Sequence, residues 1–142
     1  MKPDVASSAG YSGTPLHRKL GLKPAMCVIA LDAPPNLDAL LVGAPSDLVR
    51  LKQIAAFDCA LAFATTRDKL VSMFAKLEPK MVDSGMIWIA WPKKTSGAAT
   101  DVDENVVRRA GLAAGLVDVK VCAIDARWSG LKFVRRLRDR GR

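Results

Sequence analysis

The sequence is poor in the residues that usually build metal and redox sites. Its 142 residues include one histidine, His17, and only three cysteines. An odd number of cysteines without a CxxC pair argues against a zinc site or a disulfide framework, and one histidine cannot supply the missing ligands. Each cysteine also lies within a strand-like apolar run. We therefore expect no metal and three buried, reduced thiols, at Cys27, Cys59 and Cys122.

Long apolar runs are also lacking. The longest nearly apolar stretch, IAAFDCALAFA at 54–64, is interrupted by Asp58 and is far shorter than the roughly 20 residues of a transmembrane helix. The first ten residues, MKPDVASSAG, contain no apolar segment of a secretory signal. The sequence therefore predicts a cytoplasmic protein that does not enter the membrane, with a disordered tail over 1–10.

Acidic residues are outnumbered by basic ones. The 22 lysines and arginines face 14 aspartates and glutamates, which gives a formal net charge of +8, and the stretch RRLRDRGR at 135–142 supplies five of the arginines. A basic arm can bind nucleic acid, although no aromatic residue stands in this one to stack on bases. The simpler interpretation is a solvated chain end. We predict a single domain over 11–137 and a basic tail over 138–142.

Half of the residues are hydrophobic, which is enough for one domain with a substantial core. Apolar runs of strand length alternate with helical patterns. The predicted strands are 26–31, 47–51, 58–64 and 86–91, followed by a hairpin of LVDVKVCAID and LKFVRRL. The predicted helices are 15–20 with Thr14 as its cap, 36–42, the helix that Thr66 caps before Pro79, and 101–114 with Thr100 as its cap.

This order of segments indicates the fold class. Strands that alternate with helices and end in a hairpin are typical of a three-layer α/β domain with an open, mostly parallel sheet of about six strands. The runs at 58–64 and 86–91 are apolar on both faces, so helices should cover the sheet on both sides. On the helix after Thr66 we expect the buried side to contain Leu70, Val71, Phe74 and Leu77.

Two resemblances rest on these segments. The stretches YSGTPLHRKLGL, WPKKTSG, TDVDENVVRRAGLAAGLVDVKVCAID and WSGLKFV resemble a family of small bacterial proteins catalogued as domain of unknown function 3052, which implies no activity. The succession of FDCALAF, a helix, LEPKMVDSGMIWIAWPKK, a helix and a hairpin also resembles a trimmed methyltransferase-like Rossmann domain. That resemblance implies the strand order 2-1-3-4-6-5, an antiparallel last strand and one missing strand–helix unit.

A methyltransferase-like fold would imply S-adenosylmethionine, but two segments depart from its pattern. The turn after the first strand, ALDAPPNLDALL, has no glycine, and Pro34 and Pro35 have no N–H to offer a ligand. Arg50 and Lys52 stand near the end of the second strand, where an acid should hold the ribose hydroxyls. We therefore predict no cofactor.

Polar groups follow several predicted strands at what should be one edge of the sheet. Ligands of open α/β sheets bind beyond the carboxyl ends of the strands, where WPKKTSG and the hairpin turn RWSG should meet, with YSGT as a lid. Glycine amides, hydroxyls and lysines are groups that hold phosphate or carboxylate. The sequence predicts a cationic crevice for an anionic small molecule, lined by Tyr11, Ser12, Thr14, Arg67, Lys93, Lys94, Thr95, Ser96, Trp128 and Ser129.

Ordinary turn chemistry explains the same motif as well. Ser-Gly pairs are common in turns, and Pro92 before Lys93 and Lys94 excludes a Walker loop. The helix expected after Thr100 carries its own acids, Asp101, Asp103 and Glu104, in its first turn, so an anion would depend on the two lysines.

Catalytic groups are scarce in this sequence. Asp32 and Asp125 follow strands and could act as general bases, and His17 could reach the crevice, but none has an evident nucleophile or acid beside it. We rank a non-enzymatic binding or regulatory module first. An enzyme acting on an anionic substrate is the second hypothesis, and a nucleic-acid accessory protein that uses its arginine tail is the third.

Overall fold

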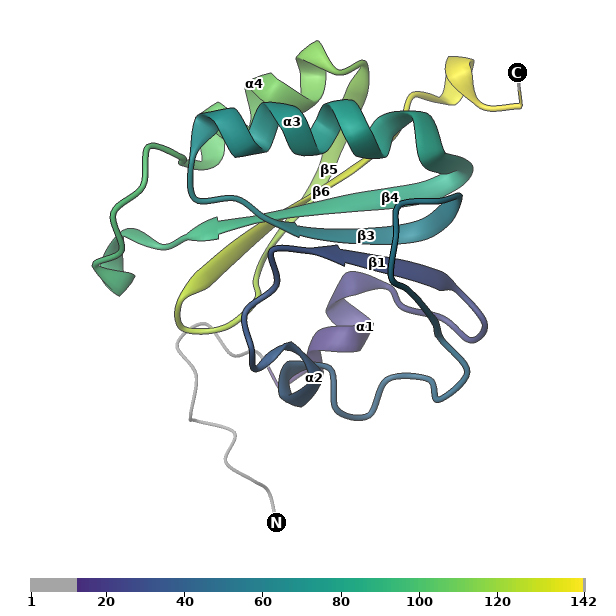
Figure 1. Cartoon of the computed structure of the whole chain (residues 1–142), viewed down its shortest axis with the longest axis horizontal. Helices are drawn as coiled ribbons and strands as arrows, with labels where there is room; N and C mark the ends of the chain where they lie inside the picture. Colours follow the sequence, from purple (N-terminus) through teal and green to yellow (C-terminus); the bar gives the residue numbers. More distant parts are fainter. Residues whose placement is uncertain (1–12, 142) are drawn as a thin grey trace.

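The computed structural model describes residues 13–141. In this range one six-stranded sheet has the order β2-β1-β3-β4-β6-β5 (Figure 1). The strands β2, β1, β3 and β4 are parallel, β6 is antiparallel to β4, and β5 is antiparallel to β6. This confirms the predicted order and hairpin. The strands are Cys27–Leu31 (β1), Val49–Leu51 (β2), Phe57–Phe63 (β3), Met81–Pro92 (β4), Leu116–Ala123 (β5) and Trp128–Arg135 (β6).

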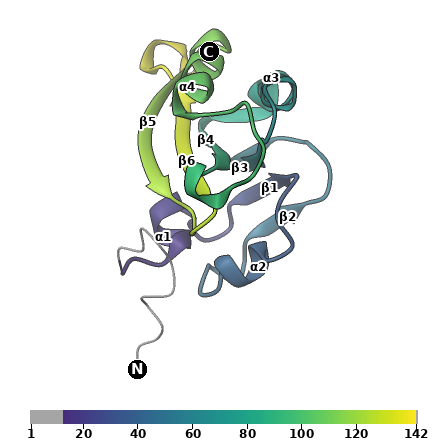
Figure 2. The ribbon, with the colours of Figure 1, turned by 90° about the vertical axis from the view of Figure 1, so that its left-hand side faces the viewer.

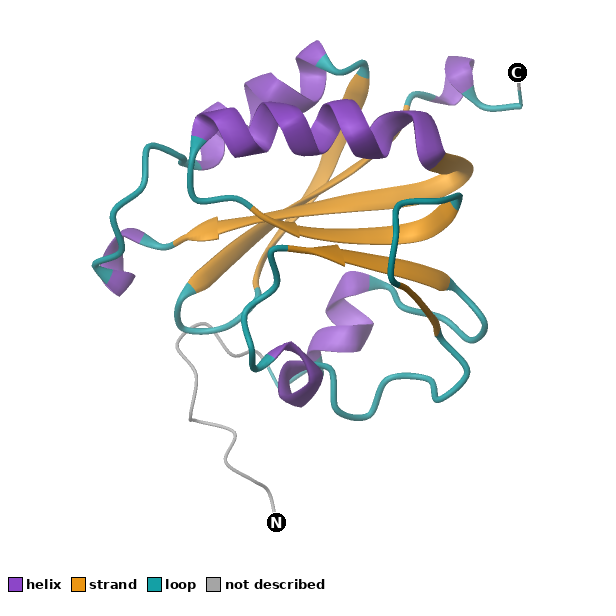
Figure 3. Cartoon of the chain, in the orientation of Figure 1, coloured by secondary structure: helices purple, strands orange, loops and turns teal. Residues whose placement is uncertain are grey.

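Helices cover both faces of the sheet, as its apolar strands predicted. The helices α3 (Arg67–Leu77) and α4 (Glu104–Ala113) lie on one face, and the shorter α1 (Leu16–Leu20) and α2 (Leu37–Leu40) lie on the other (Figures 2 and 3). Side chains alternate along β4: Ile87 and Ile89 join the core under α3 and α4, whereas Trp88 joins the core around α1. The Trp88 Nε1 group donates to the Leu20 carbonyl at 3.0 Å and so fastens α1 to the sheet.

The connection from β2 to β3 is unusually short. Parallel strands normally need a dozen or more residues between them, usually with a helix, but here residues 52–56 make the connection alone. Figure 1 shows this segment crossing the sheet as a coil. Ile54, at its centre, packs on the same core as α3. The coil therefore crosses β1 on the α3 side, where a longer crossover would carry a helix.

Two helix starts differ from the sequence prediction. The helix α1 begins at Leu16 without a side-chain cap, so the predicted cap at Thr14 is wrong. The helix α4 begins at Glu104 with Asp103 as its cap, which accepts from the Val106 N–H at 2.9 Å. Thr100 instead donates to the Thr65 carbonyl at 2.7 Å, in the loop before α3. This contact between two loops keeps residues 100–102 out of the helix.

Thr66 caps α3 as predicted, because its Oγ1 accepts from the Lys69 N–H at 3.2 Å. Val71, expected on the buried side of this helix, is 62% exposed, and Met73 is buried in its place. No helix within residues 13–141 has the length and apolar character needed to cross a bilayer.

Two strands are longer than predicted. The strand β4 begins at Met81, because Met81 pairs with Phe57 on the far side of a bulge. Gly85 lies in this strand, and a Cβ there would stand 2.7 Å from the Met81 Cγ atom. The strand β6 begins at Trp128, which pairs with Pro92 at the end of β4. Residues 128–130 of the predicted hairpin turn therefore belong to β6.

The predicted division of the chain is described only in part. The tail predicted over 1–10 lies outside the described residues, and the boundary of the domain at 137 stays a prediction. The stretch after β6 forms a 3-10 turn, Leu137–Asp139. The Gly141 N–H then donates to the Asp83 carboxylate at 2.8 Å.

Candidate functional site

A cleft of about 690 Å³ lies at the carboxyl end of β4, between the following loop and the first turns of α3 and α4. Since Pro92 pairs with Trp128, the turn between β5 and β6 reaches this same edge of the sheet. The structure thus brings together three segments that are distant in the sequence. Half of the predicted site residues line the cleft, namely Arg67, Lys93, Lys94, Thr95 and Ser129.

Three of the other predicted residues, Trp128, Ser96 and Thr14, do not line this cleft. Trp128 turns to the opposite face of the sheet, where its ring meets Phe63 edge-on with the centroids 5.0 Å apart. Ser96 closes its own turn, since its hydroxyl donates to the Lys93 carbonyl at 2.7 Å. Thr14 is exposed just before α1, which covers that opposite face. Tyr11 and Ser12 lie outside the described residues.

Three acids also line the cleft, and each is held by a neighbouring group. Asp101 accepts from the backbone N–H of Arg67 at 2.8 Å, and the Arg67 Nε group donates to the Asp101 carbonyl at 3.1 Å. Asp103 caps α4, and Glu104 accepts from Arg108 at 2.6 Å. The prediction that all three acids stand in one helical turn is wrong, because Asp101 binds the start of α3 instead.

The formal charge of the lining is therefore balanced. Arg67, Lys93 and Lys94 line the cleft together with the three acids. The sequence predicted a cationic crevice, whereas the lining carries equal numbers of cationic and acidic side chains. The acids are partly compensated by helix N–H groups and by Arg108. In the described part of the chain, no carboxylate lies within ion-pair distance of the Lys94 ammonium.

Arg108 fixes the outer wall of the cleft. Besides Glu104, it binds Asp118 of β5 through Nε at 2.9 Å. This hydrogen bond from Arg108 holds the pKa of the Asp118 carboxyl below its ordinary value. Arg108 thus links the first turn of α4 to β5, the edge strand of the sheet, and holds the Glu104 carboxylate by a hydrogen bond.

None of the three candidate catalytic groups reaches this cleft. Asp125 accepts from the N–H groups of Arg127 and Trp128, at 2.8 and 2.9 Å, and so closes the turn between β5 and β6. His17 belongs to α1 on the opposite face. Asp32 directly follows β1 in a left-handed backbone conformation with φ 54° and pairs with Lys69 at 3.5 Å, beside a different hollow.

Metal and thiol chemistry find no support in the described residues. Between residues 13 and 141, no three His, Cys, Asp or Glu side chains gather as a metal site would require. The three cysteines are free thiols; Cys59 is buried as predicted, but the prediction of burial is wrong for Cys27 and Cys122, which are only half-buried. Burial raises the pKa of Cys59 to about 12 and also raises the pKa of Cys122.

The strand order and the antiparallel final strands define a methyltransferase-like Rossmann domain. Within that class, the chain belongs to the family described as "Protein of unknown function (DUF3052)", which matches residues 40–137. No curated protein matches the sequence significantly.

Solved structures that resemble the chain include several methyltransferases. The ribosomal protein L11 methylase from Lactobacillus delbrueckii subsp. bulgaricus has a TM-score of 0.54 and 13% identity, with 85% of this chain and 75% of that chain covered. The magnesium protoporphyrin IX methyltransferase from Synechocystis PCC 6803 has a TM-score of 0.54 and 10% identity, with 85% and 74% covered. The pyocyanin biosynthetic protein PhzM has a TM-score of 0.64 and 7% identity, with 85% and 53% covered. Such low identities establish the fold alone.

The residues present do not fit S-adenosylmethionine. The helix after β1 has only four residues, and two prolines in the turn before it lack the N–H groups of a ligand-binding nest. Beyond β2 stands Lys52, an exposed cation, where an acid would bind the ribose hydroxyls. Arg50, within β2, pairs with Asp38 at 3.3 Å. Neither half of the usual cofactor site is therefore present.

The arginine-rich end of the chain is only partly a tail. Arg135 belongs to β6, and its side chain is 15% exposed and binds Glu78 at 2.6 Å. Arg140 donates to the Arg135 carbonyl at 3.2 Å. The prediction of a solvated basic stretch over 135–142 is therefore wrong for Arg135, because the sheet and the segment before β4 enclose its guanidinium.

Sequence reasoning missed several residues of the cleft. Thr100, Val102 and Asn105 line it, and Thr100 and Asp101 hold the loop before α4 against the start of α3. The run TDVDEN predicts a helix start, but it does not show which helix supplies the N–H groups that each carboxylate binds. The contact between Arg67 and Asp101 spans 34 residues, so no local pattern reports it.

Proposed function

We propose that this domain is a non-enzymatic binding module that holds an anionic small molecule in the cleft at the end of β4. The observation that carries the proposal is the meeting of Arg67, from α3, with Lys93 and Lys94, from the loop after β4, around one cleft. Cations from separate segments that converge on a concave surface are typical of phosphate and carboxylate sites.

The hydroxyl groups of the cleft support an anionic ligand. Thr95 stands in the 3-10 turn beside Lys94, and Ser129 enters from β6, where the alternation of the strand turns it toward α3 and Trp128 away. Hydroxyl and ammonium donors together can satisfy several oxygens of one anion. The acids nearby already accept hydrogen bonds within the fold, so they compete less for these donors.

A binding role is favoured over catalysis because the described part of the cleft lacks a general base with a partner. Its acids cap helices or bind Arg108, and Asp125 serves the hairpin turn. A ligand held here would meet charge and hydroxyl groups but no evident nucleophile.

The test is the thermal stability of the full chain in sodium pyrophosphate, compared with sodium chloride at equal ionic strength. A ligand that binds only the folded state raises the melting temperature. We expect a rise for the unmodified chain that is lost when Lys93→Ala and Lys94→Ala are combined.

The matched control combines Lys23→Ala with Lys52→Ala, which removes two exposed lysines outside the cleft. This variant should keep the full response to pyrophosphate. The proposal is wrong if the unmodified chain shows no rise, or if both double variants respond equally.

A further inference from the structure

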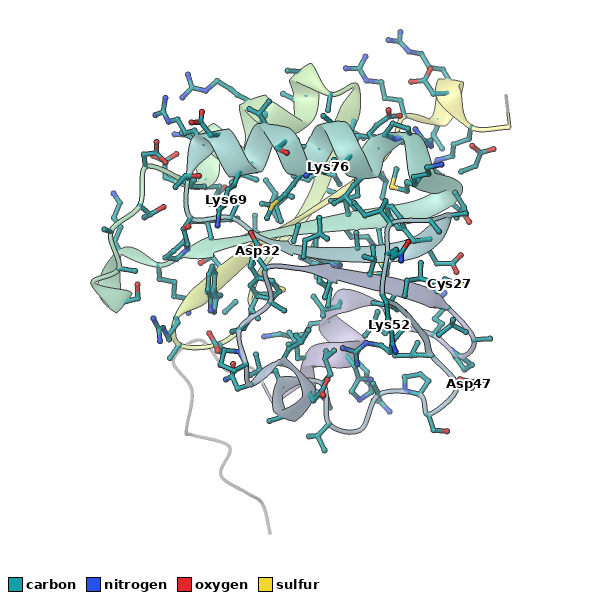
Figure 4. The ribbon with its side chains drawn as sticks, viewed as in Figure 1. Cys27, Asp32, Asp47, Lys52, Lys69 and Lys76 are labelled. Carbon is teal, nitrogen blue, oxygen red and sulfur yellow. The ribbon has the colours of Figure 1, made fainter. Side chains whose placement is uncertain are left out.

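A second hollow, of about 390 Å³, lies between the end of β1, the short crossover and α3. Its apolar lining consists of Leu31, Ile54 and Met73, one from each of these three segments. Asp32 and Lys69 also line the hollow, and Figure 4 shows Lys69 on α3 close to Asp32, with Lys76 farther along the helix. The hollow lies beyond α3 from the cleft of β4 and shares none of its lining residues.

The short crossover explains why this hollow exists. A helix between β2 and β3 would pack its apolar face on β1 beside α3, but residues 52–56 form a coil that offers only Ile54 to that core. Leu31 and Ile54 are left half-buried. The fold thus keeps an apolar floor of ligand size, because the range for small-molecule pockets begins at about 300 Å³.

Polar side chains from one side of α3 line this hollow above its apolar floor. Lys69, Ser72 and Lys76 follow at spacings of three and four, so they share one side of α3, and all three line the hollow. Lys69 is paired with Asp32 at 3.5 Å. In the described residues, by contrast, no carboxylate lies within ion-pair distance of the Lys76 ammonium.

The backbone at the opening is also distinctive. Asp32 has a φ of 54°, a left-handed conformation that is uncommon outside glycine and that clusters at ligand sites. Asp68, in the first turn of α3, adds a second carboxylate to the lining. Two acids near one end and one unpaired lysine at the other favour a ligand with a single negative charge over a phosphate dianion.

We infer that this hollow binds an apolar monocarboxylate, such as a medium-chain fatty acid or an aryl alkanoate. The carbon skeleton lies on Leu31, Ile54 and Met73, and the carboxylate is held by Lys76 with the Ser72 hydroxyl as a second donor. The site is independent of the anion cleft, which differs in lining and in the class of ligand.

The test is a titration of the isotope-labelled full chain with octanoate, followed by amide NMR shifts. We expect shifts centred on residues 31–32, 54 and 68–76. Lys76→Gln should weaken octanoate binding about five-fold, the effect of losing one largely exposed ion pair. Octanamide, which keeps the chain but not the charge, should bind the unmodified protein more weakly by a similar factor.

Two further variants complete the test. Lys23→Gln removes a lysine outside the hollow and should leave octanoate binding unchanged. Ile54→Ser removes part of the apolar floor and should weaken octanoate and octanamide alike. The inference is overturned by an absence of octanoate binding, by shifts confined to 91–105, by equal affinity for octanoate and octanamide, or by equal effects of Lys76→Gln and Lys23→Gln.

Discussion

Gly111 is the residue of α4 that lies directly against the Phe133 ring of β6, and a Cβ at this position would overlap that ring. Alanine in place of an interior helical glycine normally stabilises a helix by about 1 kcal/mol. Here we expect alanine to destabilise the protein instead. We expect Gly111→Ala to lower the free energy of unfolding by about 1–3 kcal/mol, the usual cost of overpacking, as measured by urea denaturation.

Phe133→Leu provides the control for this contact. If the ring causes the loss, adding Gly111→Ala to a Phe133→Leu chain should cost clearly less than adding it to the unmodified one. A neutral or stabilising effect of Gly111→Ala alone would contradict the close packing of α4 on the sheet.

Cys59 links burial to the pH dependence of stability. Burial raises the pKa of its thiol from 9.0 to about 12, so the unfolded chain releases this proton first as the pH rises. Between about pH 9 and pH 12 the unfolded state binds fewer protons, and the free energy of unfolding falls, by up to about 1.4 kcal/mol per pH unit. Below pH 9 this contribution is fully present.

The measurement compares urea denaturation of the unmodified chain and of Cys59→Ala between pH 8 and pH 10.5. The unmodified chain should lose stability more steeply with pH than the variant, since only the unmodified chain carries the Cys59 thiol, whose pKa burial raises. Parallel curves for the two proteins would mean that Cys59 ionises alike in the folded and unfolded states.

At the scale of elements, Arg135 joins the end of β6 to the segment before β4. Its guanidinium donates to the Glu78 carboxylate at 2.6 Å and to the carbonyls of Glu78 and Met81 at 2.8 and 2.6 Å. Removing it deprives the Glu78 carboxylate and the two carbonyls of the guanidinium donors. We expect Arg135→Ala to cost about 1.5–3 kcal/mol in the free energy of unfolding, the range for hydrogen bonds to charged groups.

Arg138 offers a matched control three residues away, because it is exposed in the 3-10 turn after β6. Arg138→Ala should change stability by less than about 0.5 kcal/mol. Arg135→Lys keeps the charge but not the planar fork, so it should recover only part of the loss. Equal losses in the two alanine variants would show that the Arg135 contacts contribute nothing specific.

The elements themselves differ in how far the sequence predicts them. Each predicted strand contains an observed one or overlaps with it. The signal is strongest for β3 and β4, because a strand that is buried on both faces needs an apolar run whatever its neighbours are. Helix starts were harder. Thr66 caps α3 as predicted, but Thr100 does not cap α4, since its hydroxyl is used by the loop before α3. Whether a residue caps a helix therefore depends on whether the rest of the fold already uses its side chain.

At the scale of the whole molecule, a methyltransferase-like sheet is present without the cofactor site of that fold. The short α2, the prolines before it and the cation after β2 leave S-adenosylmethionine without its usual donors and acceptors. We therefore expect calorimetric titration of the folded chain with S-adenosylmethionine to show no saturable heat. Saturable binding with one site per chain would contradict this prediction and would reopen the hypothesis of an enzyme.

The sequence by itself determined the order of strands and helices, the apolar runs that form the core and the loops in which polar groups gather. These features depend on local periodicity and on turn chemistry, which each segment carries with it. It also placed Lys93, Lys94 and Ser129 at one edge, because parallel strands end together.

Only the tertiary structure decided which of these polar groups meet. In the folded chain Ser129 lines the cleft and Trp128 packs on Phe63. The Asp101 carboxylate accepts a hydrogen bond from the start of α3 and not from α4. The hollow beside Lys76 arose in the same way, from a coil that crosses β1 without a helix. Such outcomes depend on contacts between segments far apart in the chain, and the periodicity of a single segment holds no information about them.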